Sequence, residues 1–425
     1  MYIDTMINVS EKLKTSMRHV IACLLFTLIG SLLQAEETFR LGIVGTTTSH
    51  VPAFVKLLND PNAEPPIAGF KVVAAYPGGM PDNPNSWDRV KQYAEDLEKQ
   101  DVKLCPTVEA MLPEVDGILL ESVDGRPHLE QAKPVIAAGK PLFIDKPMAA
   151  RLADVLEIFR LAEEKKVPVF SASSLRFAAG FQKMRNEKPL GNILGASAWS
   201  PCHLNDKHPD LVWYGIHGVE TLFTLMGTGC KTVSRTQTDG TELVVGVWNE
   251  GRIGTFRGVR TGKPGYGATV FGEKGNGDAG GYDGYKPLVE EIGQFFRTGK
   301  PPFEPQETIE IFAFMEAADV SKANGGMSVS IAEVIEKAKH EVAIPVNLWV
   351  SPNGTIRIRY ETDAVVVGTI VPLDELRSML NNMVADKPNH RVKIILRAEK
   401  GTPHETVLAV CNNLGDAVLA NFLYE

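Results

Sequence analysis

Residues 139–149 read GKPLFIDKPMA, and this stretch decides how the chain can fold. Its apolar run, 142–144, is long enough for a buried parallel strand. Pro147 ends the strand because proline has no N–H to donate to the ladder. Asp145 and Lys146 therefore stand at the carboxyl end of a predicted strand, which is where open α/β sheets bind their ligands. A solvated strand end is the alternative interpretation of the same residues.

Strand and helix patterns alternate around this stretch. Strands are predicted at 39–45, 70–76, 102–105, 115–121 and 167–172, and helices at 51–58, 86–99, 107–112, 128–138 and 150–166. Strands that alternate with helices at this spacing form βαβ units. The sequence therefore predicts an α/β fold with a Rossmann-like, doubly wound parallel sheet over 36–177.

Two further units follow. Alternating segments at 193–199, 232–238, 242–248, 251–259 and 266–271 predict an open antiparallel sheet with one covered face, followed by helices at 283–297, 307–324 and 330–339. This α+β domain spans 178–340 and would serve substrate binding and oligomerisation. A small α+β module over 344–425 begins with strands at 347–350 and 355–359 around the hairpin turn SPNG, and continues with a helix at 373–383, a strand at 392–398 and a helix at 405–420.

The composition is that of a globular protein. The chain has 425 residues, of which 44% are hydrophobic and 23% charged, and this length suggests two or three domains. The net charge of −8 and the lack of a basic run argue against nucleic acid as a partner.

The first 35 residues have the pattern of an export signal. Basic residues between positions 12 and 19 precede the apolar run 20–33, and Gln34 and Ala35 follow it. A bilayer span needs about 20 apolar residues, so a signal peptide over 1–35 that is cleaved in the periplasm is favoured over an uncleaved anchor or a buried helix. Met17 is an alternative start to Met1.

The first strand-to-helix turn carries part of a dinucleotide fingerprint. Gly45 holds the first glycine position, whereas Thr47 and His50 stand at the second and third. The next strand ends in Tyr76 and Pro77, where a ribose-binding acid would be expected. The loop TTTSH could still hold phosphate through hydroxyls and backbone N–H groups at the helix start. An ordinary turn is the alternative.

These stretches together resemble the glucose–fructose oxidoreductase / inositol dehydrogenase (Gfo/Idh/MocA) family over about 39–339. The most specific stretch is 115–148, in which a helix opens at His128 and AGK and DKP follow at the family's spacing. Asp145 replaces the glutamate of the family's E-K-P motif. RF at 176–177 and VFGEKG at 270–275 also match.

The resemblance implies an NAD(P)-dependent oxidoreductase that acts on a sugar or cyclitol hydroxyl. Lys146 would stabilise the developing alkoxide, and His217 would accept the hydroxyl proton. Trp213 stands where the family has an aspartate before this histidine, which leaves Tyr214 and Glu220 as alternative bases and a packed core histidine as the other reading of His217.

The implied contacts form two sets. NAD or NADP would contact Gly45, Thr46, Thr47, Thr48, His50, Tyr76, Glu121, His128, Asp145 and Lys146. The substrate would contact Arg176, His203 and Tyr214.

Metal and disulfide sites are not predicted. His203 and His208 lack a second spaced pair of ligands. Cys105, Cys202, Cys230 and Cys411 are scattered, which is typical of buried small residues, although a Cys202–Cys230 bridge is possible.

The third unit resembles the periplasmic domain of the ExbD/TolR biopolymer-transport proteins, at 346–358, in VPLDELRSML (371–380) and in VKIILRAE (392–399). Those proteins carry an acidic transmembrane helix before this domain, and this chain shows none there. A docking module for an envelope partner or for dimerisation is therefore predicted, within a homo-oligomer.

Two other functions stay open. One is a glycosidase-like hydrolase of the same fold that retains NAD. The other is a cofactor-free carbohydrate-binding protein, which the export signal favours, because with Arg18 as its one arginine it predicts export of an unfolded chain that carries no nucleotide.

Overall fold

The computed structural model describes residues 38–361, 366–383, 385, 390–414 and 418–424. The predicted export signal lies outside these residues. The chain divides into Met1–Phe39 and Arg40–Glu425, and apart from Phe39 every element below belongs to the second unit. In the part of the chain that is described, no helix combines the length and the apolar character needed to cross a membrane.

A six-stranded parallel sheet forms the first domain. Its strands are β1 (Phe39–Val44), β2 (Phe70–Tyr76), β3 (Lys103–Leu104), β4 (Gly117–Leu120), β5 (Leu142–Asp145) and β6 (Val169–Ala172). Their order, β3-β2-β1-β4-β5-β6, is that of the doubly wound dinucleotide-binding fold. The predicted Rossmann-like sheet is confirmed.

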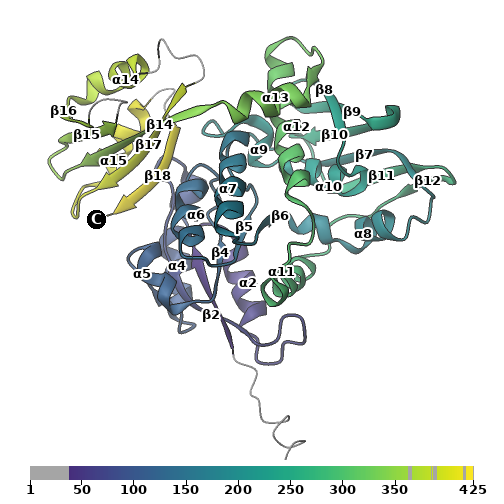
Figure 1. Cartoon of the computed structure of the whole chain (residues 1–425), viewed down its shortest axis with the longest axis horizontal. Helices are drawn as coiled ribbons and strands as arrows, with labels where there is room; N and C mark the ends of the chain where they lie inside the picture. Colours follow the sequence, from purple (N-terminus) through teal and green to yellow (C-terminus); the bar gives the residue numbers. More distant parts are fainter. Residues whose placement is uncertain (1–37, 362–365, 384, 386–389, 415–417, 425) are drawn as a thin grey trace, which may run out of the picture. The chain divides into compact units, whose positions relative to one another are not determined.

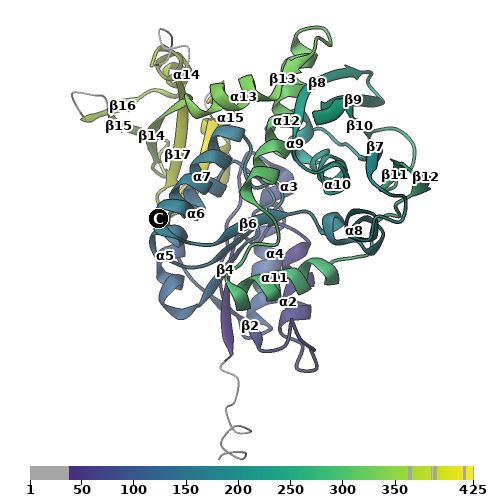
Figure 2. The same ribbon diagram turned by 45° about the vertical axis from the view of Figure 1, so that its right-hand side comes forward.

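Two groups of helices flank this sheet. Helices α2 (His50–Leu58), α4 (Val90–Glu98) and α11 (Lys286–Thr298) pack together, and so do α5 (Val108–Met111), α6 (His128–Ala137) and α7 (Leu152–Lys165) (Figures 1 and 2). The single helix predicted at 86–99 is wrong, because α3 (Pro84–Trp87) is separate from α4. The Ser86 hydroxyl accepts a hydrogen bond from the Met80 N–H (2.9 Å), which ties α3 to the preceding loop.

A seven-stranded sheet forms the second domain. Its strands are β7 (Ile193–Pro201), β8 (Cys230–Gln237), β9 (Thr241–Trp248), β10 (Ile253–Val259), β11 (Gly267–Gly272), β12 (Gly275–Asp278) and β13 (Val329–Ser330). The fully antiparallel prediction is wrong, because β10 pairs with β7 in parallel. Local alternation of side chains does not reveal which distant strand becomes a neighbour.

Helices cover one face of this second sheet. They include α10 (Ile216–Met226) and α12 (Pro305–Ala323), with α8 (Ala179–Asn186), α9 (Asp210–Trp213) and α13 (Ile331–Lys339) nearby (Figure 2). The four cysteines named above are buried free thiols, so the Cys202–Cys230 bridge is not formed.

A third sheet, β16-β15-β14-β17-β18, follows. Its elements are β14 (Val342–Val350), β15 (Ile356–Glu361), β16 (Val366–Val371), α14 (Leu373–Asn382), β17 (His390–Ala398), α15 (His404–Asn413) and β18 (Val418–Tyr424). The hairpin predicted at 351–354 is confirmed. Strands β16 and β18 were not predicted, and the helix predicted over 405–420 ends at Asn413.

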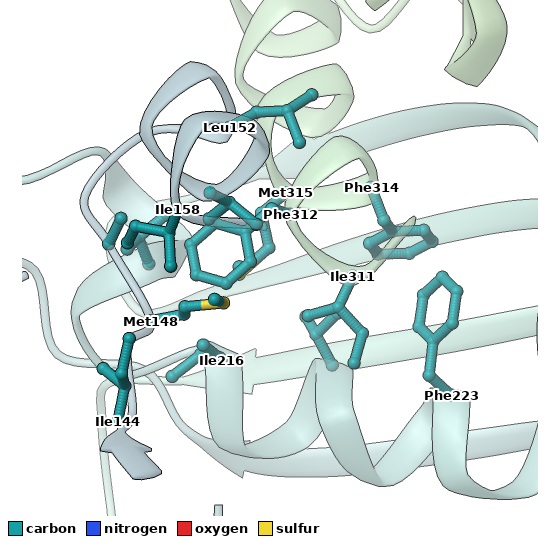
Figure 3. Close-up of a cluster of buried hydrophobic side chains, with 14 of the residues drawn as sticks. Ile144, Met148, Leu152, Ile158, Ile216, Phe223, Ile311, Phe312, Phe314 and Met315 are labelled. Atoms are coloured by element: carbon teal, nitrogen blue, oxygen red, sulfur yellow. The ribbon is translucent and has the colours of Figure 1, made fainter. Parts of the chain in front are cut away.

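The apolar core of the first two domains is continuous behind the end of β5. Figure 3 shows Ile144 and Met148 in one buried cluster with Phe312 and Met315 of α12. Ile144 and Met148 flank the short segment that carries Lys146 and are both fully buried. The backbone of Lys146 is therefore anchored on both sides.

Candidate functional site

A cavity of about 430 Å³ lies at the carboxyl edge of the first sheet, within the size range of small-molecule sites. Segments that follow β1, β4, β5 and β6 form one wall, and loops of the second domain form the other. The lining residues are Thr48, Ser49, His50, Asn85, Arg89, Val123, Lys146, Ser174, Leu175, His203, Leu204, Trp213, Tyr214, His217, Tyr266, Tyr282 and Tyr285.

Lys146 and His217, the predicted catalytic residues, both line this cavity. The side chain of His217 is directed by Ser173, whose Oγ lies 2.7 Å from the His217 Nδ1. Ser173 thus orients His217, while Trp213 packs on His208 at 4.9 Å between ring centroids. Although His217 lies on the buried helix α10, its side chain lines the cavity, which differs from the alternative of a packed core histidine.

The charge state of His217 follows from its surroundings. Burial lowers the pKa of His217 well below its usual value, and the positive charges of Lys146 and His50 lower it further. The imidazole is therefore neutral near neutral pH and can accept a proton.

The depressed pKa of His217 predicts acid sensitivity. The unfolded chain binds a proton at this histidine below about pH 6.5, whereas the folded chain does not. The free energy of unfolding should therefore fall as the pH decreases below about 6.5. Urea unfolding between neutral and mildly acidic pH measures this, and a His217→Gln variant should lose part of the slope.

Glu220, an alternative base, is already engaged. Its two carboxylate oxygens accept hydrogen bonds from the Ser173 N–H (2.8 Å) and the Arg176 Nε (2.7 Å). Arg176 is 2% exposed and also pairs with Glu307 (2.5 Å). Predicting Arg176 as a substrate contact is wrong, because its guanidinium is held by carboxylates inside the protein. His203 and Tyr214, the other predicted substrate contacts, do line the cavity.

The structure adds a histidine–carboxylate pair that the sequence did not suggest. The His50 Nδ1 lies 2.8 Å from the Asp145 Oδ2, and both side chains are buried. Burial raises the pKa of Asp145, but the charges of His50 and Lys146 outweigh it and lower the pKa overall. Asp145 therefore stays ionised. It does not line the cavity itself but contacts His50, which does.

The first strand-to-helix turn is built around Gly45, which has φ of +85°. Its N–H donates to the Tyr76 carbonyl oxygen (2.9 Å), and a Cβ at this position would overlap the Ser122 Oγ. This turn therefore requires glycine both for its backbone angle and for its packing.

Replacing Gly45 by alanine tests this turn. Backbone strain at positive φ costs about 1–3 kcal/mol, and the overlap with Ser122 adds to it, so Gly45→Ala should lower the free energy of unfolding by more than Gly139→Ala. Gly139 has φ of +71° but open space at its Cβ position, which makes it the matched control. Urea unfolding of both variants gives the comparison. Equal losses would contradict the packing argument.

The hydroxyl groups of the three threonines after Gly45 form hydrogen bonds with the backbone of the protein. Thr46 Oγ1 donates to the Val90 carbonyl oxygen (3.1 Å), Thr47 Oγ1 accepts from the Val123 N–H (2.8 Å), and Thr48 Oγ1 accepts from the His50 N–H (3.3 Å). Thr46 and Thr47 are fully buried, so the prediction that their hydroxyls face a phosphate is wrong. Thr48 lines the cavity.

The segment between β2 and α4 covers these threonines. Arg126 binds it through Asp82, with its Nη1 and Nη2 at 2.9 and 2.8 Å from the two carboxylate oxygens. Asp124 accepts from Arg126 and from the Asn83 side chain (2.8 Å). This buried network fixes the segment between β2 and α4.

Tyr76, His128 and Glu121, which were also predicted to contact the nucleotide, lie outside the cavity lining too. Tyr76 is 8% exposed and ends β2, just before the segment that leads to α4. His128 is fully buried, with its Nδ1 and Nε2 at 3.2 and 2.7 Å from the carbonyl oxygens of Met148 and Ser122. Glu121 is fully buried. Predicting His128 as a nucleotide contact is wrong, because both ring nitrogens are occupied by the backbone.

The residues that remain fit a dinucleotide. The amino end of α2 lines the cavity at Thr48–His50 and presents the positive end of the helix dipole to a diphosphate. Arg89 and Asn85 line the same cavity and add a cation and an amide. Lys146 and His217 line this cavity as well.

Aromatic residues supply much of the remaining lining. Tyr266 lies 3.2 Å from Tyr214 between hydroxyl oxygens, and the Tyr285 ring lies 4.6 Å from the His50 ring. Tyr266, Tyr282 and Tyr285 were not predicted, since they come from loops that no sequence motif marks. Such rings offer apolar faces and hydroxyl groups together.

The comparisons with known proteins concern the first domain and the fold. Residues 39–173 match the family model described as "Oxidoreductase family, NAD-binding Rossmann fold". This match lies within the first domain and agrees with the resemblance that the sequence indicated. An uncharacterized oxidoreductase of Synechocystis is 34% identical over 70 residues, which cover 16% of this chain and only 19% of that relative.

Solved structures share the fold. The myo-inositol dehydrogenase of Lactobacillus casei, determined with NAD(H) and myo-inositol, has a TM-score of 0.56 at 16% identity and covers 69% of this chain and 96% of its own. A probable dehydrogenase of Thermotoga maritima has a TM-score of 0.56 at 20% identity and covers 70% and 100%.

Proposed function

We propose that this protein is an NAD(P)-dependent oxidoreductase that transfers a hydride from a secondary hydroxyl of a sugar or cyclitol. The observation that carries the proposal is the meeting of Lys146, His217 and the amino end of α2 in one cavity of a matched NAD-binding fold. The inositol dehydrogenases among the structural neighbours support a polyol as the substrate class.

The roles of the protein groups follow from their positions. NAD(P), when bound, supplies the nicotinamide ring that accepts the hydride. Lys146 carries the positive charge that stabilises alkoxide character on the substrate oxygen. His217 is neutral, and when its Nδ1–H donates to the Ser173 Oγ, its Nε2 is free to take the hydroxyl proton. The four tyrosines of the cavity provide faces and hydroxyls for a polyol ring.

The test is a combined binding and turnover assay on the full chain. NAD and NADP are titrated separately, and a panel of sugars and cyclitols is then screened for formation of the reduced nicotinamide by its near-ultraviolet absorbance. We expect one nucleotide to bind and at least one polyol to be oxidised. Release of free sugar from aryl glycosides without net reduction would support the NAD-retaining hydrolase. Failure of both nucleotides to bind would overturn the proposal and favour the carbohydrate-binding protein.

We also propose that the protein is exported and assembles as a homo-oligomer. The signal pattern of residues 1–35 supports export. Exposed apolar side chains on neighbouring strands of the second sheet, Leu194, Val247, Ile253 and Phe271, support self-association through that face. Cell fractionation tests the first point, and light scattering of the parent and an Ile253→Asp variant tests the second.

The third module is proposed to dock an envelope partner. Its resemblance to the ExbD/TolR periplasmic domain supports this role. Its buried core, which includes Leu348, Leu376 and Leu396, is completed by Met80 of the first domain. Crosslinking in intact cells with and without residues 344–425 tests the proposal.

A further inference from the structure

Three ionisable side chains meet just behind the cavity wall. Leu120 of β4 pairs with Ile144 of β5 in parallel register, so the next residues along the two strands, Glu121 and Asp145, are neighbours on the same face of the sheet. His50, the first residue of α2, lies over them. One nitrogen of His50 and one oxygen of each carboxylate all lie within 4.8 Å of one another.

The Glu121 carboxylate has an unusual environment. It is 0% exposed, and within the described part of the chain neither of its oxygens has a hydrogen-bond partner. Burying a carboxylate without a partner is costly, and buried polar groups are nearly always satisfied. Asp145, a second carboxylate, lies beside Glu121, and its negative charge raises the pKa of Glu121 further above the usual value.

The neighbouring charges do not resolve this. Lys146 follows Asp145 and is 7% exposed, but no ion pair joins its ammonium to Glu121 among the residues that the structure describes. The His50 Nδ1 lies 2.8 Å from the Asp145 Oδ2. Two carboxylates therefore face one ammonium and one imidazole. Among the residues that the structure describes, the Glu121 oxygens accept no hydrogen bond.

We infer that His50, Glu121 and Asp145 form a binding site for a divalent transition-metal ion. One imidazole nitrogen with two carboxylate oxygens suits Zn²⁺, Mn²⁺ or Fe²⁺, whereas Mg²⁺ and Ca²⁺ prefer ligand sets made of oxygen alone. A divalent ion would neutralise both carboxylates and supply the partner that Glu121 lacks. Sequence spacing did not predict this site, since its ligands come from two strand ends and the first residue of a helix.

The inference does not depend on the proposed oxidoreductase activity. The ion would lie behind Lys146 and His50, so it would fix the His50 ring against the cavity wall whatever the cavity binds. The cluster would then be a structural support for the site, held by the carboxyl ends of two adjacent strands.

Metal binding by the full chain tests the inference without nucleotide or substrate. The protein is treated with a chelator, dialysed against Zn²⁺ or Mn²⁺ alone, and analysed for bound metal by mass spectrometry. We expect about one ion per chain, as for a single site. In Glu121→Gln the affinity should fall by more than the roughly 10–100-fold that loss of an outer-shell partner costs.

A matched control uses the exposed pair of Glu336 and His340, whose carboxylate and Nε2 are 2.9 Å apart. Glu336→Gln removes a carboxylate beside a histidine at the surface and should leave metal binding unchanged. A chelator-treated parent protein whose melting temperature rises with Zn²⁺ or Mn²⁺, but not with Mg²⁺, would support the site even if Glu121→Gln fails to fold. A parent that binds none of these ions, or equal losses in the two variants, would overturn the inference. Either result would leave the nucleotide assay above to be judged separately.

Discussion

Lys146→Met should lower kcat for polyol oxidation by about 10²–10³-fold, the range found when one preorganised group that stabilises an oxyanion is removed. Methionine nearly keeps the length and apolar stem of lysine but carries no charge. The segment around Lys146 is anchored by Ile144 and Met148 in the core, so the fold should persist. Nucleotide affinity and melting temperature should change little in comparison with kcat.

Steady-state kinetics with the best substrate from the polyol screen, together with nucleotide titration, measures these effects. Lys91→Met is the control, because the Lys91 side chain is 90% exposed. A Lys146→Met enzyme that turns over at the parent rate would remove Lys146 from the proposed mechanism. Loss of nucleotide binding in that variant would instead assign Lys146 to cofactor recognition.

Arg176→Met should lower the free energy of unfolding by about 3–5 kcal/mol, because removing one member of a buried ion pair leaves its partner uncompensated. Arg176 links Glu220 to Glu307, and both carboxylates are nearly buried. The Arg176 guanidinium also lies 4.0 Å from the centre of the Phe303 ring, and that contact would be lost as well.

Urea unfolding followed by circular dichroism measures the loss. Adding Glu220→Gln to Arg176→Met should recover part of the stability, since it removes one of the stranded charges. Arg160 provides the control, because its ion pairs with Glu157 and Glu164 are exposed, and Arg160→Met should lower the free energy of unfolding far less than Arg176→Met. Equal losses for the two arginines would contradict the assignment of Arg176 to the core.

The Rossmann-like sheet could be predicted because its signal is local and repeated. Each strand of that sheet is an apolar run and each helix has its own periodicity, so the alternation alone fixes the topology class. The second sheet was harder, since the parallel partner of β10 is β7, far away in the sequence. Pairing between distant strands leaves no mark on either strand alone.

The candidate site divides in the same way. Lys146 and His217 could be placed because short motifs mark them. The pairing of His50 with Asp145 could not, although one begins a helix and the other ends a strand of the same sheet. Arg176 was misassigned because a motif match gives the position of an arginine but not its partners. Tyr266, Tyr282 and Tyr285 were not predicted because loop residues carry no periodic signal.

The two walls of the cavity differ in how freely they can change. Lys146 is fixed by a strand end and His217 by a core helix, whereas Tyr266, Tyr282 and Tyr285 belong to connections between elements. Substitutions at these three tyrosines can therefore change which molecules the cavity binds, while Lys146 and His217 keep their positions relative to each other.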